Sequence, residues 1–307
     1  MENVTYVSPN LILLGIVEIE KFRYLYCLPC LVVYMFIMFL STVIVVVVWT
    51  EESLHEPMYI LICSLVLNGI YGSSTFFPKL IIDLFSSSKT ISRVGCLAQS
   101  FCVLTFAFFE ICIFTAMAYD RYLAVYFPLQ YIILMTNGKA LKFILGSFIF
   151  SFVSVLIAIL LSARLPLCRF HIKNIFCDNV SYFILSCVDS SINNLYGAIV
   201  FLFFLSFTLT ISKHACEKAI HTLVTHLLNF SIFLIGVLFI FIRYRLGNID
   251  LPLGLQILLS ATCLVVPPLL NPLIYGIRMK VLQQKVKHFL KKIIKNALQC
   301  GRALTLR

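Results

Sequence analysis

The chain has 307 residues, of which 61% are hydrophobic and only 12% charged, with a formal net charge of +11. A soluble domain usually carries about 25% charged residues. This excess of hydrophobic over charged residues argues against a soluble protein with deeply buried helices and indicates that lipid surrounds the chain.

Seven segments are long and apolar enough to cross a bilayer, which takes about 20 mostly apolar residues in a helix. In chain order they are 24–50, 57–85, 94–120, 140–163, 190–212, 219–242 and 251–277. A helix satisfies its own backbone hydrogen bonds in lipid, whereas an open strand cannot. The sequence therefore predicts an all-α membrane protein, a seven-transmembrane helix bundle between an N-terminal segment (1–23) and a tail (278–307).

The tail after Tyr275 carries Lys and Arg residues throughout and no acid. Basic residues near span ends favour the cytoplasm, so we expect the tail inside and the N-terminus outside. Five apolar residues recur in it at helical spacing: Leu282, Val286, Phe289, Leu290 and Ile293. This pattern predicts a short amphipathic helix along the inner leaflet. A basic tail can also indicate nucleic acid, but its attachment to a membrane bundle argues against that partner.

Four cysteines fall on the predicted outer side, at positions 96, 168, 177 and 187. Disulfides persist in that oxidising environment. A Cys96–Cys177 bond would join the second outer loop to the third span, and a Cys168–Cys187 bond would close the loop on itself. Spacing alone does not fix this connectivity.

Two tripeptides match the glycosylation pattern, one beginning at Asn3 and the other at Asn179. Such tripeptides are common by chance. We favour Asn3, in the N-terminal segment, as the glycan acceptor.

The strongest motif closes the third span with Met-Ala-Tyr-Asp-Arg-Tyr over residues 117–122 and continues to Phe-Pro-Leu at 127–129. An acid–base pair at a helix end is often only a solvated terminus. This string, however, resembles the Asp-Arg-Tyr region of rhodopsin-like G-protein-coupled receptors, in the form typical of odorant receptors. Asn271-Pro272-Leu273-Ile274-Tyr275 in the last span resembles the Asn-Pro-x-x-Tyr motif of the same family. Residues 54–59 resemble its first inner loop.

The resemblance extends from about residue 10 to about residue 295, and Phe-Pro-Lys-Leu at 77–80 suggests the fish-type branch of the family. It implies an odorant receptor of the plasma membrane that binds small odorants in the outer half of the bundle. On the inner side it implies activation of a heterotrimeric G protein of the stimulatory olfactory type. No enzyme activity, cofactor or metal is expected.

Two groups of residues are candidates for the activation switch. Arg121, held by Asp120 and followed by Tyr122, would form a breakable latch of the kind that a two-state element needs. Asn271, Pro272 and Tyr275 would form a pivot, because proline removes a backbone donor and kinks a helix. An ordinary packing kink is the alternative for the second group.

The candidate ligand pocket lies on one face of the third span, inward of Cys96. Four residues share that face by helical spacing: Val103, Leu104, Ala107 and Phe108. An apolar wall with few polar groups suits small organic ligands. Ordinary helix packing explains each residue about equally well.

Glu110 is the one acid deep inside a span, where a charge is expensive and marks a functional candidate. A neutral, hydrogen-bonded core acid is the alternative. In the resembled receptors this glutamate lies near a sodium site. Here Ser41 replaces the family's asparagine, and Gly69 stands where an acid is usual, which puts sodium binding in doubt.

The largest departure from the family lies between Phe207 and Lys218, where the connection between the fifth and sixth spans is shorter than usual. These span ends form part of the G-protein docking surface in the resembled receptors. The shortening either weakens coupling or marks a decayed or mispredicted gene product.

A channel or transporter is the rival from another class, but the chain has no duplicated half and no paired interrupted spans. An enzyme would need a motif such as His-Glu-x-x-His or a glycine-rich phosphate loop, and neither occurs. A non-olfactory rhodopsin-like receptor is a nearer rival. An amine receptor would carry an acid on the pocket face of the third span, where Val103 stands.

Overall fold

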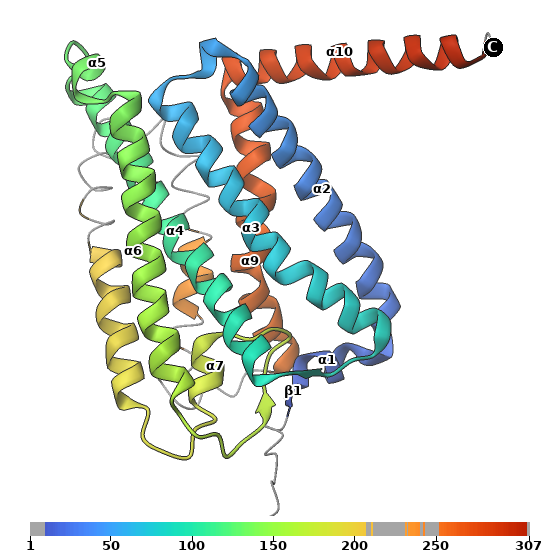
Figure 1. Ribbon diagram of the computed structural model, residues 1–307, viewed down its shortest axis with the longest axis vertical. Coiled ribbons are helices and arrows are strands. Elements are labelled where there is room, and N and C mark those ends of the chain that lie inside the picture. Colours follow the sequence, from blue (N-terminus) through green and yellow to red (C-terminus); the bar gives the residue numbers. More distant parts are fainter. Residues whose placement is uncertain are drawn as a thin grey trace, which may run out of the picture.

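The computed structural model describes residues 10–206, 210, 231, 233–239, 242 and 252–305. These form a bundle of long helices, with a small sheet at one end and a helix that projects sideways from the other (Figure 1). Among them, five helices are long and apolar enough to cross a membrane: α2 (Arg23–Thr50), α3 (Pro57–Ser86), α4 (Arg93–Tyr126), α6 (Asn137–Ala163) and α9 (Leu253–Arg278). The chain is thus an all-α membrane protein of the seven-transmembrane class, as its sequence predicts.

The other two predicted spans lie partly outside the described residues. The span at 190–212 appears as an apolar helix over Ser191–Ser206. In the span at 219–242 the structure describes helical residues at 231, 233–239 and 242. The shorter elements are β1 (Leu11–Leu13), α1 (Leu14–Ile19), the 3-10 helices η1 (Glu20–Phe22) and η2 (Glu52–Leu54), β2 (Thr90–Ile91), α5 (Tyr131–Leu134), β3 (His171–Ile172), α7 (Asn179–Phe183) and α10 (Lys280–Thr305).

Local chemistry explains where several spans begin. α3 starts at Pro57, whose fixed φ suits the first helical turn. α4 starts after Ser92, whose hydroxyl oxygen accepts a hydrogen bond of 3.1 Å from the Gly95 amide. α6 starts after Thr136, which accepts from the Lys139 amide at 3.3 Å. These caps fix the helix ends at the charged and polar breaks between apolar runs.

α4 lies at the centre of the bundle, with Phe106, Glu110 and Ile113 fully buried. α6 lies at the periphery and exposes large apolar side chains such as Leu145 and Leu160. A contiguous exposed apolar surface marks contact with another apolar phase. The peripheral faces therefore suit contact with lipid.

Residues 11–22 of the N-terminal segment fold against the bundle as β1, α1 and η1. β1 pairs antiparallel with β2 and parallel with β3, and Leu11 and Leu13 are fully buried. Just after β1, a Cβ on Gly15 would lie 2.6 Å from the Ile175 side chain and 2.7 Å from the Asn174 backbone. Only glycine fits this close approach. We call the end of the bundle that carries this sheet the sheet end.

α10 follows α9 at the opposite end of the bundle and projects sideways from it, past α2 (Figure 1). Leu282 is fully buried, and Val286, Phe289 and Leu290 pack against the core. The Lys285 ammonium donates a hydrogen bond of 2.5 Å to the Glu51 carboxylate, and this bond lowers the pKa of Glu51. The helix extends to Thr305, so it is longer than the sequence pattern indicates.

Candidate functional site

A mostly apolar cavity of about 130 Å³ lies between α4, α6, α7 and the Ser191–Ser206 helix. All four residues of the predicted pocket face line it: Val103, Leu104, Ala107 and Phe108. Phe233, from the predicted sixth span, and Leu264, from α9, also line it. Helices far apart in the sequence thus converge on one space at the sheet end.

The loop of residues 164–190, which contains β3 and α7, covers the cavity with Phe176, Val180 and Phe183. The structure joins Cys96 at the start of α4 to Cys177 in this loop. It joins Cys168 to Cys187 within the loop. The first bond holds the cavity cover on α4, and the second closes the loop on itself.

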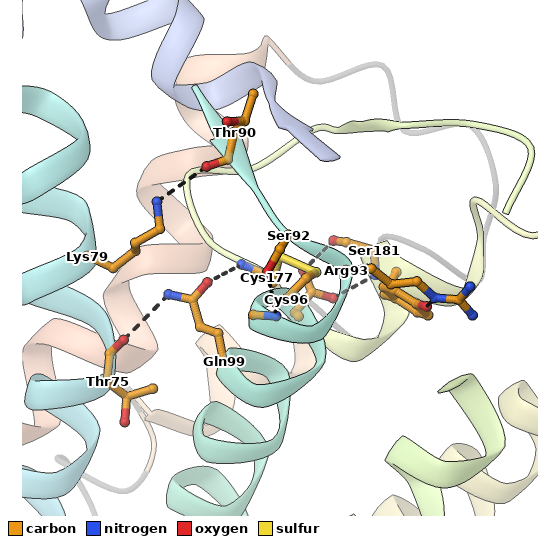
Figure 2. Close-up of a disulfide and its surroundings, with 12 residues drawn as sticks. Thr75, Lys79, Thr90, Ser92, Arg93, Cys96, Gln99, Cys177 and Ser181 are labelled. Atoms are coloured by element: carbon orange, nitrogen blue, oxygen red, sulfur yellow. Dashed lines mark hydrogen bonds between the residues drawn. A yellow bond between two sulfur atoms is a disulfide. The ribbon is translucent and has the colours of Figure 1, made fainter. Parts of the chain in front are cut away.

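Gln99 fixes the same loop by hydrogen bonds (Figure 2). Its side-chain oxygen accepts from the Cys177 amide at 2.9 Å, and its nitrogen donates to the Thr75 carbonyl at 3.4 Å. One buried amide therefore connects the cavity cover to both α4 and α3. Nothing in the sequence distinguished Gln99 from other polar residues near a span end.

Arg93 connects the loop to the end of α6. Its Nε donates to the Tyr182 hydroxyl at 2.6 Å, and its Nη2 donates to the carbonyl oxygens of Ala163 and Leu165, each at 2.8 Å. Because three acceptors share one guanidinium, the loop and two helix ends are held in fixed relative positions.

Polar groups from the Ser191–Ser206 helix and from the N-cap of α7 also line the cavity. Tyr196 donates its hydroxyl proton to the Ser154 carbonyl at 2.9 Å. Asn193 donates to the Ser162 hydroxyl at 3.0 Å. Asp178 caps α7 by accepting from the Ser181 amide at 2.8 Å. Helical periodicity could not reveal these residues, because α7 and the Ser191–Ser206 helix meet α4 only in the folded chain.

The two glycosylation tripeptides lie in different environments. Asn179 lines the cavity and is only 8% exposed, so a glycan there is incompatible with this fold. Asn3 lies outside the described residues.

Glu110 lies at the centre of a buried polar cluster that joins three helices. Its Oε2 accepts a hydrogen bond of 2.7 Å from Asn68 on α3, and its Oε1 accepts one of 2.9 Å from Asn271 on α9. Asn68 also donates to the Phe106 carbonyl at 3.1 Å. The cluster connects α3, α4 and α9 through one carboxyl group.

The surroundings of Glu110 fit a sodium ion poorly. Both of its oxygens already accept hydrogen bonds from amides. At position 69 a Cβ would lie 3.3 Å from the Pro268 backbone, which leaves little space for a second acid. Among the described residues, no group of three or more His, Cys, Asp or Glu side chains is placed to hold a metal ion.

The Asp120–Arg121 pair lies at the opposite end of α4. Arg121 Nη2 lies 2.8 Å from Asp120 Oδ2, and the Asp120 side chain is fully buried. Tyr131, in α5, donates a hydrogen bond of 2.7 Å to the other oxygen, Oδ1. Burial and the neighbouring carboxylate raise the pKa of Tyr131, so its hydroxyl remains a donor. Tyr122 packs its ring against Tyr126 instead, with the centroids 4.8 Å apart.

The second switch group lies within α9. Asn271 and Tyr275 are buried. Pro272 lies inside the helix, which nevertheless continues to Arg278. The shortened connection between Phe207 and Lys218 falls almost wholly outside the described residues.

Comparison with known proteins finds a matching family and similar proteins that align over most of the chain. The olfactory receptor family matches residues 30–293. Olfactory receptor 52B6 of Homo sapiens is 30% identical over 302 residues, which cover 93% of this chain and 90% of that protein. Olfactory receptor 6B2 of Homo sapiens is 32% identical over 303 residues, covering 93% and 96%. Olfactory receptor 5H19 of Mus musculus is 32% identical over 282 residues, covering 85% and 90%.

Proposed function

This chain belongs to the olfactory receptor family of G-protein-coupled receptors, and from that premise we propose that odorants bind in the cavity beneath α7. It is a multi-pass membrane receptor for odorants and not an enzyme. One observation carries the proposal: an apolar cavity of about 130 Å³ is lined by α4, by the disulfide-held loop and by α9 at once. A ligand of that size can therefore bias the relative positions of these elements.

We place the sheet end outside the cell and α10 inside. Both disulfides lie in or at the 164–190 loop, and such bonds persist in an oxidising compartment. α10 carries the basic tail residues at the other end of the bundle (Figure 1). Positive charge near span ends favours the cytoplasmic side, where anionic lipids attract it.

We propose that α4 carries the signal, because it reaches from the cavity wall at Val103 to the Asp120–Arg121 pair. The hydrogen bonds of Glu110 lie between these two points and link α4 to α3 and α9. An odorant that binds one arrangement of the helices better shifts the population toward it. In that arrangement Arg121 leaves Asp120 and faces the G protein, while Asn271, Pro272 and Tyr275 provide the pivot in α9.

The partner on the inner side is a heterotrimeric G protein, and we propose the stimulatory olfactory type by resemblance to the family. The test is a cAMP reporter in cells that display the full chain on their surface, with an odorant panel. Arg121→Ala is expected to abolish the response at unchanged surface level. A response that survives this substitution at full strength would contradict the latch.

Cavity occupancy is tested by a second substitution, Ala107→Trp, which fills the space. Its control is Leu160→Trp on the lipid-facing side of α6, where the side chain is 60% exposed. We expect Ala107→Trp to abolish odorant responses and the control to keep them. Equal responses from both variants would place the odorant elsewhere.

A further inference from the structure

We propose that the cavity selects odorants carrying a hydrogen-bond donor, an O–H or N–H group, over odorants of the same shape that carry only acceptors. This inference rests on the proposed odorant site. It starts from two asparagines of the cavity wall, Asn179 and Asn193, which are 8% and 4% exposed. Their side-chain oxygens are buried and accept no hydrogen bond from the residues that the structure describes.

The orientation of the Asn193 amide follows from its neighbours. The Ser162 hydroxyl donates its single proton to the Ala158 carbonyl at 3.1 Å. Ser162 can therefore only accept from Asn193, and the Asn193 nitrogen, 3.0 Å away, must be the atom that faces it. This arrangement leaves the Asn193 oxygen as the unpaired acceptor. Nearly all buried acceptors in proteins are paired, because an unpaired one costs free energy. A ligand that donates a hydrogen bond to this oxygen therefore removes that cost and binds more tightly.

The other polar groups of the wall add acceptors more than donors. Tyr196 has already donated its proton to the Ser154 carbonyl, so it offers a ligand only its lone pairs. Asp178 adds a carboxylate at the capped end of α7. No Lys, Arg or His is among the described residues that line the cavity. The Ser154 hydroxyl can donate or accept, so it does not discriminate.

This arrangement defines a ligand class. Alcohols and amines can donate to the Asn193 oxygen while their apolar portion lies against Val103 and Ala107. Ketones, esters and ethers carry only acceptor oxygens, which cannot donate a hydrogen bond to the Asn193 oxygen and leave it unpaired. A ligand carboxylate would place a second negative charge in a cavity that Asp178 already lines.

The test uses the full chain in cells with the cAMP reporter and matched probe pairs, n-alkanols and dialkyl ethers with equal numbers of non-hydrogen atoms. We expect the alkanol to act at a roughly ten-fold lower concentration than its ether, as one additional hydrogen bond to a buried group allows. Asn193→Leu removes the acceptor at similar volume. It is expected to raise the half-maximal alkanol concentration roughly ten-fold and to leave the ether unchanged.

Asn194→Leu is the matched control, because Asn194 is the next residue on the same helix and does not line the cavity. Asn179→Leu provides a second variant if Asn193→Leu fails to reach the surface, and it is expected to reduce the same alkanol preference. The outcome that overturns the inference is an ether as potent as its alkanol, with both responses lost in Ala107→Trp. That result would contradict the donor preference but not the odorant site. Alkanol responses that persist in Ala107→Trp would instead contradict the odorant site itself.

Discussion

Tyr131 donates a hydrogen bond of 2.7 Å to Asp120, whose other carboxylate oxygen holds Arg121. Tyr131 lies in the short helix α5, outside the membrane spans, whereas Asp120 ends the apolar part of α4. The acid of the proposed latch is therefore held from two sides. The same carboxylate therefore links the tyrosine of α5 to the arginine of α4.

Removing the hydroxyl tests this arrangement. Tyr131→Phe keeps the ring and deletes one hydrogen bond to a charged group, a contribution of about 1.5–3 kcal/mol. If that bond favours the resting state, the variant is expected to raise cAMP in the absence of odorant. The measurement is basal reporter output normalised to surface receptor. The double variant with Arg121→Ala should return to background, and a basal signal unchanged by Tyr131→Phe would show that the bond does not bias the switch.

The hydrogen bonds of Glu110 can be tested by exchanging its carboxyl group and the Asn271 amide between the two positions. Glu110→Gln places an amide nitrogen against that of Asn68 or Asn271, and the loss is expected to be about 1–3 kcal/mol of stability. Adding Asn271→Asp supplies an acceptor on α9 and should recover a large part of that loss. The measurement is the Tm of purified receptor in detergent. Purely additive destabilisation in the double variant would argue against direct pairing.

The two disulfides are expected to contribute unequally. Cys96–Cys177 spans 81 residues of sequence and Cys168–Cys187 spans 19. The loss of unfolded-chain entropy on closing these loops is expected to stabilise the folded protein by about 4.5 kcal/mol for the first bond and about 3.2 kcal/mol for the second. Replacing both cysteines of each pair by alanine should therefore lower Tm more for the first pair. The opposite order would mean that the local loop closure matters more than the link to α4.

Substitution by alanine is expected to destabilise the protein at Gly15 and to stabilise it at Gly146. A Cβ at Gly15 would lie 2.6 Å from Ile175, whereas at Gly146, within α6, it would meet nothing within 4 Å. Gly15→Ala is expected to lower Tm and loosen the N-terminal segment, detected by faster proteolysis at the sheet end. Gly146→Ala is expected to stabilise the chain by up to about 1 kcal/mol, because alanine favours helix. Two shifts of the same sign would contradict the close approach at Gly15.

Part of the site followed from helical periodicity alone. Val103, Leu104, Ala107 and Phe108 share a face of α4 in any helix of that sequence, and all four line the cavity. The residues that face them across the cavity could not be found in this way. Asn193 belongs to a different helix, and its relation to Ser162 depends on how that helix packs against α6.

The sequence by itself determined that the long apolar segments which the structure describes are helices, because an apolar run of about 20 residues in lipid has few alternatives to a helix that satisfies its own backbone. Only the tertiary structure decided which polar groups meet inside the bundle. Glu110 pairs with residues 42 and 161 positions away, and β1 adds a strand between β2 and β3 from distant loops. Side-chain periodicity reports the face of one helix, while a hydrogen bond between helices depends on their rotation and depth, which the packing of the whole chain sets.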